Sequence, residues 1–148
     1  MASFVFNNGR GRVPQLIDDA ATIKVLLLKV AESDAGLKDR DTVAAILAAA
    51  NTEADFITNY ARKTLTGLTS TVDDTNEKVN SDCSDVTWAS AGGITNNTLV
   101  KAIFYWDADG TDANAIPLAA FDFAVTTDGS NLTLRTGTSG FYEVRDVA

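Results

Sequence analysis

An eight-residue apolar run in the second half of the chain constrains the fold more than any other stretch. It covers residues 99–106 and reads LVKAIFYW. Alternate residues of a strand point to opposite faces. One face carries Leu99, Lys101, Ile103 and Tyr105, and the other carries Val100, Ala102, Phe104 and Trp106. Because both faces are mainly apolar, we expect this strand to lie in the middle of a sheet.

Other short segments also have strand composition. Residues 23–30 (IKVLLLKV) are apolar apart from two lysines, which predicts a strand with much of both faces covered. In residues 118–125, alternation predicts one face with Phe121, Phe123 and Val125 and another with Leu118, Ala120, Asp122 and Ala124. Turn residues separate these segments from further candidate strands. The further candidates are residues 65–72, residues 85–88, a short strand at Leu132 and Leu134, and residues 141–144.

One helix is expected early in the chain, over residues 42–50. Asp41 is a suitable N-cap, and Asn51 suits the other end. Its apolar stripe consists of Val43, Ile46, Leu47 and Ala50, at the spacing of a single helix face. We therefore predict a mainly β fold: an antiparallel β-sandwich or barrel with one short α-helix inserted early.

Length and charge narrow the organisation and the partners. The 148 residues contain no internal repeat, so we expect a single β-rich domain over 1–148, with residues 1–14 as a candidate N-terminal arm. The net charge is −8, from 20 acidic and 12 basic side chains, and an acidic surface is repelled by phosphate backbones and anionic lipid. We therefore expect neither a nucleic-acid partner nor a membrane partner.

The residue inventory argues against several kinds of catalysis. The chain has no histidine, which excludes Ser-His-Asp, Cys-His and His-metal sites. It has a single cysteine, Cys83, which excludes an internal disulfide. Acidic neighbours predict a partly buried, inert Cys83 thiol. We also find no phosphate-binding or dinucleotide glycine motif, so no catalytic residue and no cofactor are expected. The N-terminal segment lacks a signal-peptide core, which predicts synthesis in the cytoplasm.

An acidic loop follows the central apolar run. Residues 105–118 (YWDADGTDANAIPL) place Asp107, Asp109, Asp112 and Asn114 around Gly110. Alternating carboxylates are typical of calcium loops, although the glycine comes too early for an EF-hand and no glutamate closes the loop. The same residues are also typical of a turn between two strands. The loop is interpreted first as a turn, with calcium binding as the alternative and carboxylate catalysis last.

The N-terminal arm has two readings. Phe4 and Phe6 alternate with other residues, and Arg10 and Arg12 follow after a glycine. An arm that is apolar at one end and basic at the other suits docking onto an acidic neighbouring subunit. It equally suits the first strand of the protein's own sheet.

Several segments, taken in order, resemble a widespread group of small virion proteins of tailed bacteriophages. They are residues 23–28 (IKVLLL), 60–65 (YARKTL), 72–76 (VDDTN), 85–88 (DVTW), 100–105 (VKAIFY) and 116–123 (IPLAAFDF). The resemblance covers most of the chain, and the arm and the helix match least well. It implies a structural virion part without catalysis, preferably a capsid decoration (cement) protein.

The resemblance also implies a location and partners. It places the protein on the capsid exterior of the virion, as a homo-oligomer, with a trimer favoured, in contact with the major capsid protein. The residues expected at those interfaces are Phe4, Phe6, Arg10, Arg12, Val43, Ile46 and Leu47. The alternatives are a tail, collar or fibre-base component, and a calcium- or carbohydrate-binding β-module.

Overall fold

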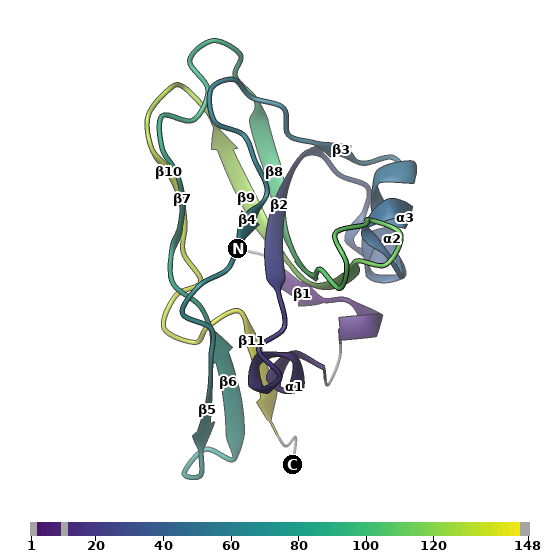
Figure 1. The fold of residues 1–148 in the computed structure, drawn as a ribbon, viewed down its shortest axis with the longest axis vertical. Helices are drawn as coiled ribbons and strands as arrows, with labels where there is room; N and C mark the ends of the chain where they lie inside the picture. The colour runs from purple at the N-terminus through teal and green to yellow at the C-terminus, as the bar shows by residue number, and fades with distance from the viewer. Residues whose placement is uncertain (1–2, 10–11, 146–148) are drawn as a thin grey trace.

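The computed structural model describes residues 3–9 and 12–145 (Figure 1). The strands are β1 (Ser3–Val5), β2 (Ile23–Val30), β3 (Thr52–Glu53), β4 (Lys63–Thr64), β5 (Thr69–Asp73), β6 (Lys78–Asp82), β7 (Val86–Trp88), β8 (Thr98–Trp106), β9 (Ile116–Thr126), β10 (Leu132–Leu134) and β11 (Tyr142–Arg145). The helices are the 3-10 helix η1 (Asn7–Gly9), α1 (Val13–Asp18), α2 (Asp34–Lys38) and α3 (Val43–Ala48). The protein is mainly β, with antiparallel sheets in a sandwich-like arrangement, which confirms the predicted fold class.

The largest sheet has the strand order β1-β9-β8-β2-β3, and β4 also pairs with β2. All of its pairings are antiparallel. The strand predicted to be central, β8, lies between β9 and β2, as its two apolar faces require. The first strand, β1, pairs with β9, so residues 3–5 form part of the protein's own sheet.

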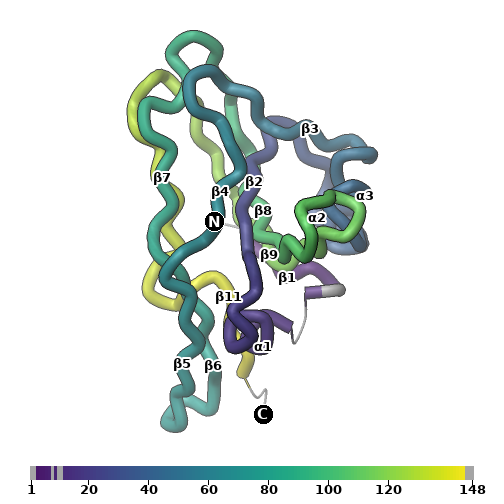
Figure 2. Tube along the Cα trace, viewed as in Figure 1, coloured from purple at the N-terminus to yellow at the C-terminus, as the bar shows by residue number. Residues whose placement is uncertain are grey.

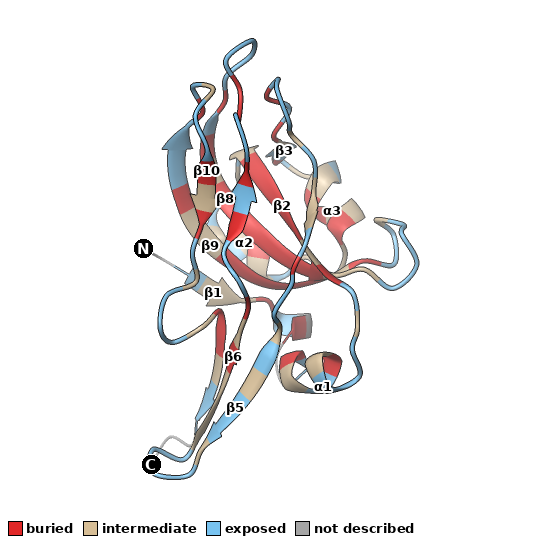
Figure 3. Ribbon diagram, turned by 60° about the vertical axis from the view of Figure 1, so that its left-hand side comes forward, coloured by how far each residue is buried: buried red, intermediate tan, exposed pale blue. Residues whose placement is uncertain are grey.

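Many residues in the central strands of this sheet are buried (Figure 3), and their side chains pack in one core on each face. On one face, Val25, Leu27 and Phe104 pack in a core with Trp88 of β7 and Leu132 of β10. The β7–β10 ribbon therefore forms the second layer of the sandwich. On the other face, a smaller core joins Leu26, Leu28 and Ile103 to Leu37 of α2 and to Val43 and Ile46 of α3.

Two irregularities in the β8–β9 pairing change which residues share a face. The register shifts between Leu99 and Lys101, and again between Phe104 and Tyr105. Next to the first shift, Leu99 lies in the larger core and Val100 against the smaller one, the reverse of simple alternation. Leu118 likewise joins Phe123 in the larger core, while Ala120 is in the smaller one, so the predicted shared face of Leu118 and Ala120 is wrong. An extra residue in one strand shifts the alternation that follows it.

A third sheet, with order β11-β6-β5, extends from one end of the molecule (Figure 2). The β5–β6 hairpin turn lies at one end of the long axis, and the β7–β8 connection lies at the other. Residues 65–68, predicted as part of a strand, precede β5 without strand structure, and β6 was not predicted. Its sequence, KVNSD, alternates poorly in hydrophobicity, so pairing with β5 and β11 determines it.

The helices are short. The predicted helix exists as α3, but its N-cap is Thr42 and not Asp41: the Thr42 hydroxyl accepts a hydrogen bond from the Ala45 amide at 3.1 Å. Asn51 closes the other end, donating to the Ile46 carbonyl at 2.9 Å. The prediction of a single helix missed α1 and α2, whose five or six residues are too few for helical periodicity to stand out. Within residues 3–9 and 12–145, every helix is too short to cross a lipid bilayer.

Candidate functional site

The acidic loop after β8 is held by hydrogen bonds within the chain. Asp107 forms a salt bridge with Lys24 at 2.5 Å and accepts a hydrogen bond from the Gly110 amide at 2.8 Å. Asp109 accepts bonds from the Thr111 amide and hydroxyl, at 3.0 and 2.7 Å, and from the Asn114 side chain at 2.6 Å. These bonds to nearby residues are those that stabilise polar turns.

Arg62 connects this loop to the rest of the protein. Its guanidinium forms two bonds to Glu53, at 2.7 and 2.8 Å, and two to Asp112, at 2.5 and 3.0 Å. It also lies 5.7 Å from the centre of the Tyr105 ring. The bonds to Glu53 and Asp112 raise the pKa of Arg62 above its usual value. Arg62 therefore joins the loop to β3 by two bidentate contacts.

Further hydrogen bonds hold Glu53 and Asp112, the two partners of Arg62, in position. The Tyr60 hydroxyl donates to Glu53 at 2.5 Å and accepts from the Leu27 amide at 3.3 Å. Burial, reinforced by Glu53, raises the pKa of Tyr60. The Asp112 backbone carbonyl accepts from the Ala44 amide at 2.9 Å, at the start of α3. The loop thus connects the central sheet to a helix.

These contacts leave the carboxylates badly placed for a cation. Asp107 faces Lys24, Asp112 faces Arg62, and Asp109 is bonded to Thr111 and Asn114. In the described part of the chain, acidic and cysteine side chains do not gather in a group of three or more that could hold a metal ion. The residues present do not fit a calcium site, and the geometry favours the turn interpretation.

We expect millimolar calcium to leave the melting temperature unchanged. A site saturated at about 100 times its Kd would add about 2.7 kcal/mol to the free energy of unfolding, which is easily seen in a thermal melt. The measurement compares melts with calcium chloride, with magnesium chloride at equal ionic strength, and with chelator. An increase of several degrees specific to calcium would show that the loop binds the ion.

Replacing Asp107 by asparagine is expected to make stability less dependent on pH in the acid range. The salt bridge from Lys24 holds the pKa of the Asp107 carboxyl below its usual range. Its contribution is therefore present above the unfolded pKa, about 4, and is lost as pH falls through the lower folded value. Urea unfolding should show Asp107→Asn less stable than the natural protein at pH 7, with the difference shrinking towards pH 3. An equal difference at both pH values would contradict this assignment.

Neither the cysteine nor the aromatic side chains form an open site. Cys83 is buried, and this burial, together with the charge of Asp82, raises the pKa of its thiol to about 11. The thiol is therefore protonated at neutral pH and is a poor nucleophile. Of the four aromatic residues that could stack on a sugar, Trp88, Tyr105 and Tyr142 are buried and Trp106 is half-buried, so together they do not provide the exposed stacking surface that a carbohydrate site uses.

Comparisons with known proteins do not assign this chain to a family. No protein-family model matches it, and searches of curated proteins and of solved structures found no significant match. The function is therefore inferred from the residues and the geometry.

Three of the seven predicted interface residues lie in the protein's own core. Phe6, Val43 and Ile46 are fully buried between the central sheet and the helices. The apolar stripe of α3 packs on the sheet of the same chain, so the expectation that these three contact another subunit is corrected. Sequence periodicity identified a packing face but not what covers it.

The remaining predicted interface residues differ in accessibility. Phe4 and Leu47 are half-buried, and Arg12 is exposed. Arg10 lies outside the described residues. Phe4 also lines a hollow of ≈ 340 Å³ between β1 and β11. Of the aromatic arm residues, only Phe4 is partly accessible.

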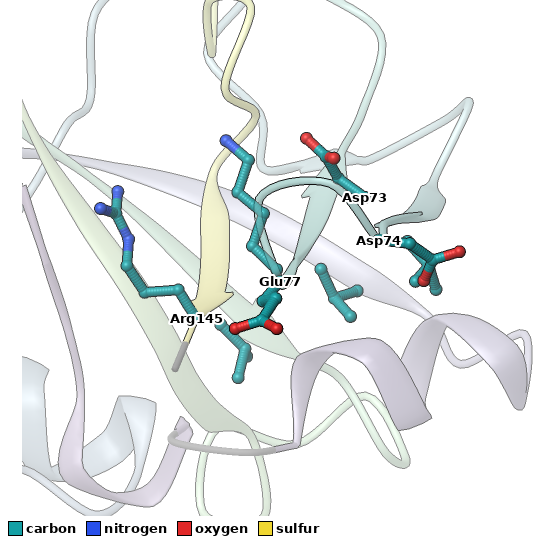
Figure 4. A pocket seen from close by; sticks show the side chains of 8 residues that line it. Asp73, Asp74, Glu77 and Arg145 are labelled. Atoms are coloured by element: carbon teal, nitrogen blue, oxygen red, sulfur yellow. The ribbon is translucent and has the colours of Figure 1, made fainter. Parts of the chain in front are cut away.

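Exposed apolar side chains occur at both ends of the long axis. At one end, Ile94 is 78 % exposed and its amide donates to the carbonyl of Ile57, which is also exposed. At the other end, the β5–β6–β11 sheet exposes Val72 and Val144. These two valines line an open hollow of ≈ 400 Å³ with acidic residues of the hairpin turn (Figure 4). The sequence did not indicate this hollow, because it depends on the pairing of β11 with β6.

Proposed function

We propose that this protein is a non-enzymatic structural component of a tailed-bacteriophage virion, preferably a capsid decoration protein that bridges and stabilises major capsid subunits. The geometric observation behind the proposal is the pair of exposed apolar ends on a β-domain with a buried core on both faces of its central sheet. A domain with an adhesive surface at each end is suited to joining two neighbours. The virion setting of the proposal comes from the resemblance of several segments, in their order along the chain, to phage virion proteins.

The proposed mechanism is contact alone. Each copy adds interfacial area at a seam between capsid subunits, so that separating the subunits also requires that area to be exposed to water. Binding to the assembled shell, and not to dispersed subunits, shifts the equilibrium towards the shell. Many copies, each with an interface of ordinary size, suffice without any chemical step.

The test uses particles that lack this protein. We expect the purified protein to sediment with such particles and to raise the temperature at which they release DNA. It is also expected to run as an oligomer, with a trimer favoured, in light scattering. A monomer without affinity for the particles would overturn the decoration role.

Copy number separates this role from a tail, collar or fibre-base role. The resemblance implies hundreds of copies per particle for a decoration protein and tens or fewer for the alternatives. Quantitative gel analysis of intact particles distinguishes these ranges. A low copy number would move the proposal to the tail, collar or fibre base.

A further inference from the structure

We propose that the hairpin end of the molecule binds a cationic, partly apolar segment of another protein. This inference rests on the contact role proposed above and specifies its docking surface and the chemistry of the partner. The surface, called here the hairpin face, consists of Val72, Val79 and Val144 together with the turn residues Asp73, Asp74 and Glu77. Three observations carry the inference: a row of valines, an excess of negative charge, and an open hollow that joins them.

The valines form a row across three strands. Val72 of β5 is opposite Val79 of β6, and Val79 is opposite Val144 of β11. Directly paired residues project from the same face of a sheet, so the three side chains lie side by side. Val72 is 66 % exposed and Val144 is 41 % exposed. Val79, between them, is half-buried. A single exposed valine is ordinary, whereas a row of three adjacent valines with both outer members exposed indicates a surface that another molecule covers.

The same face continues into the core of the protein. Two residues before Val72 in the strand, Ser70 is opposite Ser81, which is opposite Tyr142, and both Ser81 and Tyr142 are buried. The opposite face of the sheet is polar, with Thr71, Asn80 and Glu143 in one row. The valine row therefore lies on the same face as a row that the protein buries, but beyond the part that the protein itself covers.

The charges around the valines are unbalanced. Lys78 and Arg145 also line the hollow, but both form ion pairs with Glu143. In the described part of the chain, no ion pair includes Asp73, Asp74 or Glu77. Figure 4 shows these three acidic residues around the turn, with Arg145 on the neighbouring strand. Lys78 lies opposite Asp73 in the β5–β6 pairing and helps to lower the pKa of its carboxyl. The four carboxylates of Asp73, Asp74, Glu77 and Glu143 still outnumber the two cations, Lys78 and Arg145, so the turn presents an excess of negative charge.

The helix next to this sheet also carries exposed acidic residues. Helix α1 lies against β5 and β6 and ends with two exposed carboxylates, those of Asp18 and Asp19. Asp73 is held by bonds from the Asn76 amide and side chain, at 3.1 and 2.7 Å, which keep the pKa of its carboxyl below the usual range. The carboxylate is thus charged and fixed in position near neutral pH. Positive charge is the complement of this surface.

Apolar area and negative charge together identify the partner better than either one alone. A divalent cation would neutralise the carboxylates but would leave the valine side chains exposed to water. A second copy of this chain carries the same net charge of −8, so pairing two hairpin ends would bring like charges together. A protein segment with lysine or arginine beside apolar side chains satisfies both requirements. In the proposed virion role, such a segment would belong to a neighbouring capsid subunit.

The first test uses three blocked hexapeptides as probes and the full chain labelled with ¹⁵N. The probes alternate lysine with valine, lysine with serine, and glutamate with valine. We expect the lysine–valine peptide to shift amide signals of β5, β6 and β11, with binding weakened at high salt. The lysine–serine peptide should bind several-fold more weakly, and the glutamate–valine peptide should not bind. Shifts centred on the Ile94 end, or equal binding by both lysine peptides, would overturn the inference.

Variants connect the binding to named side chains. Asp74→Lys combined with Glu77→Lys is expected to weaken lysine–valine binding at least tenfold, because attraction becomes repulsion. Val72→Thr should weaken it about fourfold through the loss of one apolar group. The matched control is Val30→Thr, an exposed valine on β2, which should leave binding unchanged. Thermal melts check that each variant is folded, and unchanged binding by a folded charge-reversed variant would refute the proposal.

Particle binding separates this inference from the proposed function. If the natural protein and the charge-reversed variant both bind particles that lack the protein, the decoration role stands and this docking surface is wrong. If the natural protein binds the lysine–valine peptide and not the particles, the docking chemistry stands and the decoration role fails. Loss of particle binding only in the charge-reversed variant would support both.

Discussion

Replacing Trp88 with alanine should lower the free energy of unfolding by about 3–5 kcal/mol, the usual cost of deleting a large buried aromatic side chain. Trp88 is fully buried between the β7–β10 ribbon and the central sheet. Its indole nitrogen also donates to the Ala61 carbonyl at 2.8 Å, so the substitution removes that donor as well. Small domains are stable by only about 5–15 kcal/mol in total, so the variant should lose a large share of its stability.

Urea unfolding followed by circular dichroism measures this effect. The matched control is Trp106→Ala, because Trp106 is also a strand tryptophan but is only partly buried, so its replacement should cost clearly less. Trp88→Phe retains most of the packing and loses the hydrogen bond, and we expect a cost of about 1 kcal/mol from that bond. Equal destabilisation by the two alanine variants would show that Trp88 does not anchor the ribbon.

The second large effect is expected from Arg62→Ala, which should lower the free energy of unfolding by about 2–3 kcal/mol. Arg62 forms bidentate contacts with both Glu53 and Asp112. Only 24 % of the Arg62 side chain and 21 % of the Glu53 side chain are exposed. Without the guanidinium, the Glu53 carboxylate lacks its counter-charge in a poorly solvated position, which is the main source of the loss. Asp112 is more accessible to water and contributes less.

Two further variants test this explanation. Arg62→Lys keeps the charge but cannot form two planar bidentate contacts, so its stability should lie between that of the natural protein and that of Arg62→Ala. Arg135→Ala removes an exposed arginine paired with Asp85 at 3.2 Å and should cost less than about 1 kcal/mol. Similar losses for Arg62→Ala and Arg135→Ala, measured by urea unfolding, would contradict a special role for the Arg62 network.

The outcome for the acidic loop shows how far local sequence patterns reach. The residue types between Asp107 and Asn114 were compatible with both a turn and a calcium loop. The bonds of Asp109 to Thr111 and Asn114 are local and follow from the sequence itself. Asp107 pairs with Lys24 and Asp112 pairs with Arg62, and both cations are far away in the sequence. Because of these ion pairs, the carboxylates do not converge on one cation. No spacing rule within the loop indicates those two cations.

The hairpin face could not be predicted for a similar reason. Val72 stands at the end of a predicted strand, and Val144 at the end of another, with no pattern relating them. They become neighbours because β6 pairs with β5 on one side and with β11 on the other. The valine row is therefore a product of strand register, and register depends on the whole sheet.

The sequence by itself determined the mainly β class, the central position of β8, the bounds of β2 and the existence of α3. These features depend on local composition and on the two apolar faces of single segments, which each segment carries wherever it packs. The tertiary structure alone decided the bulges in the β8–β9 pairing, the burial of Phe6 and Ile46, and the assembly of the Arg62 network and the hairpin face. Each of these depends on contacts between residues distant in the chain, and local pattern does not specify which segments meet.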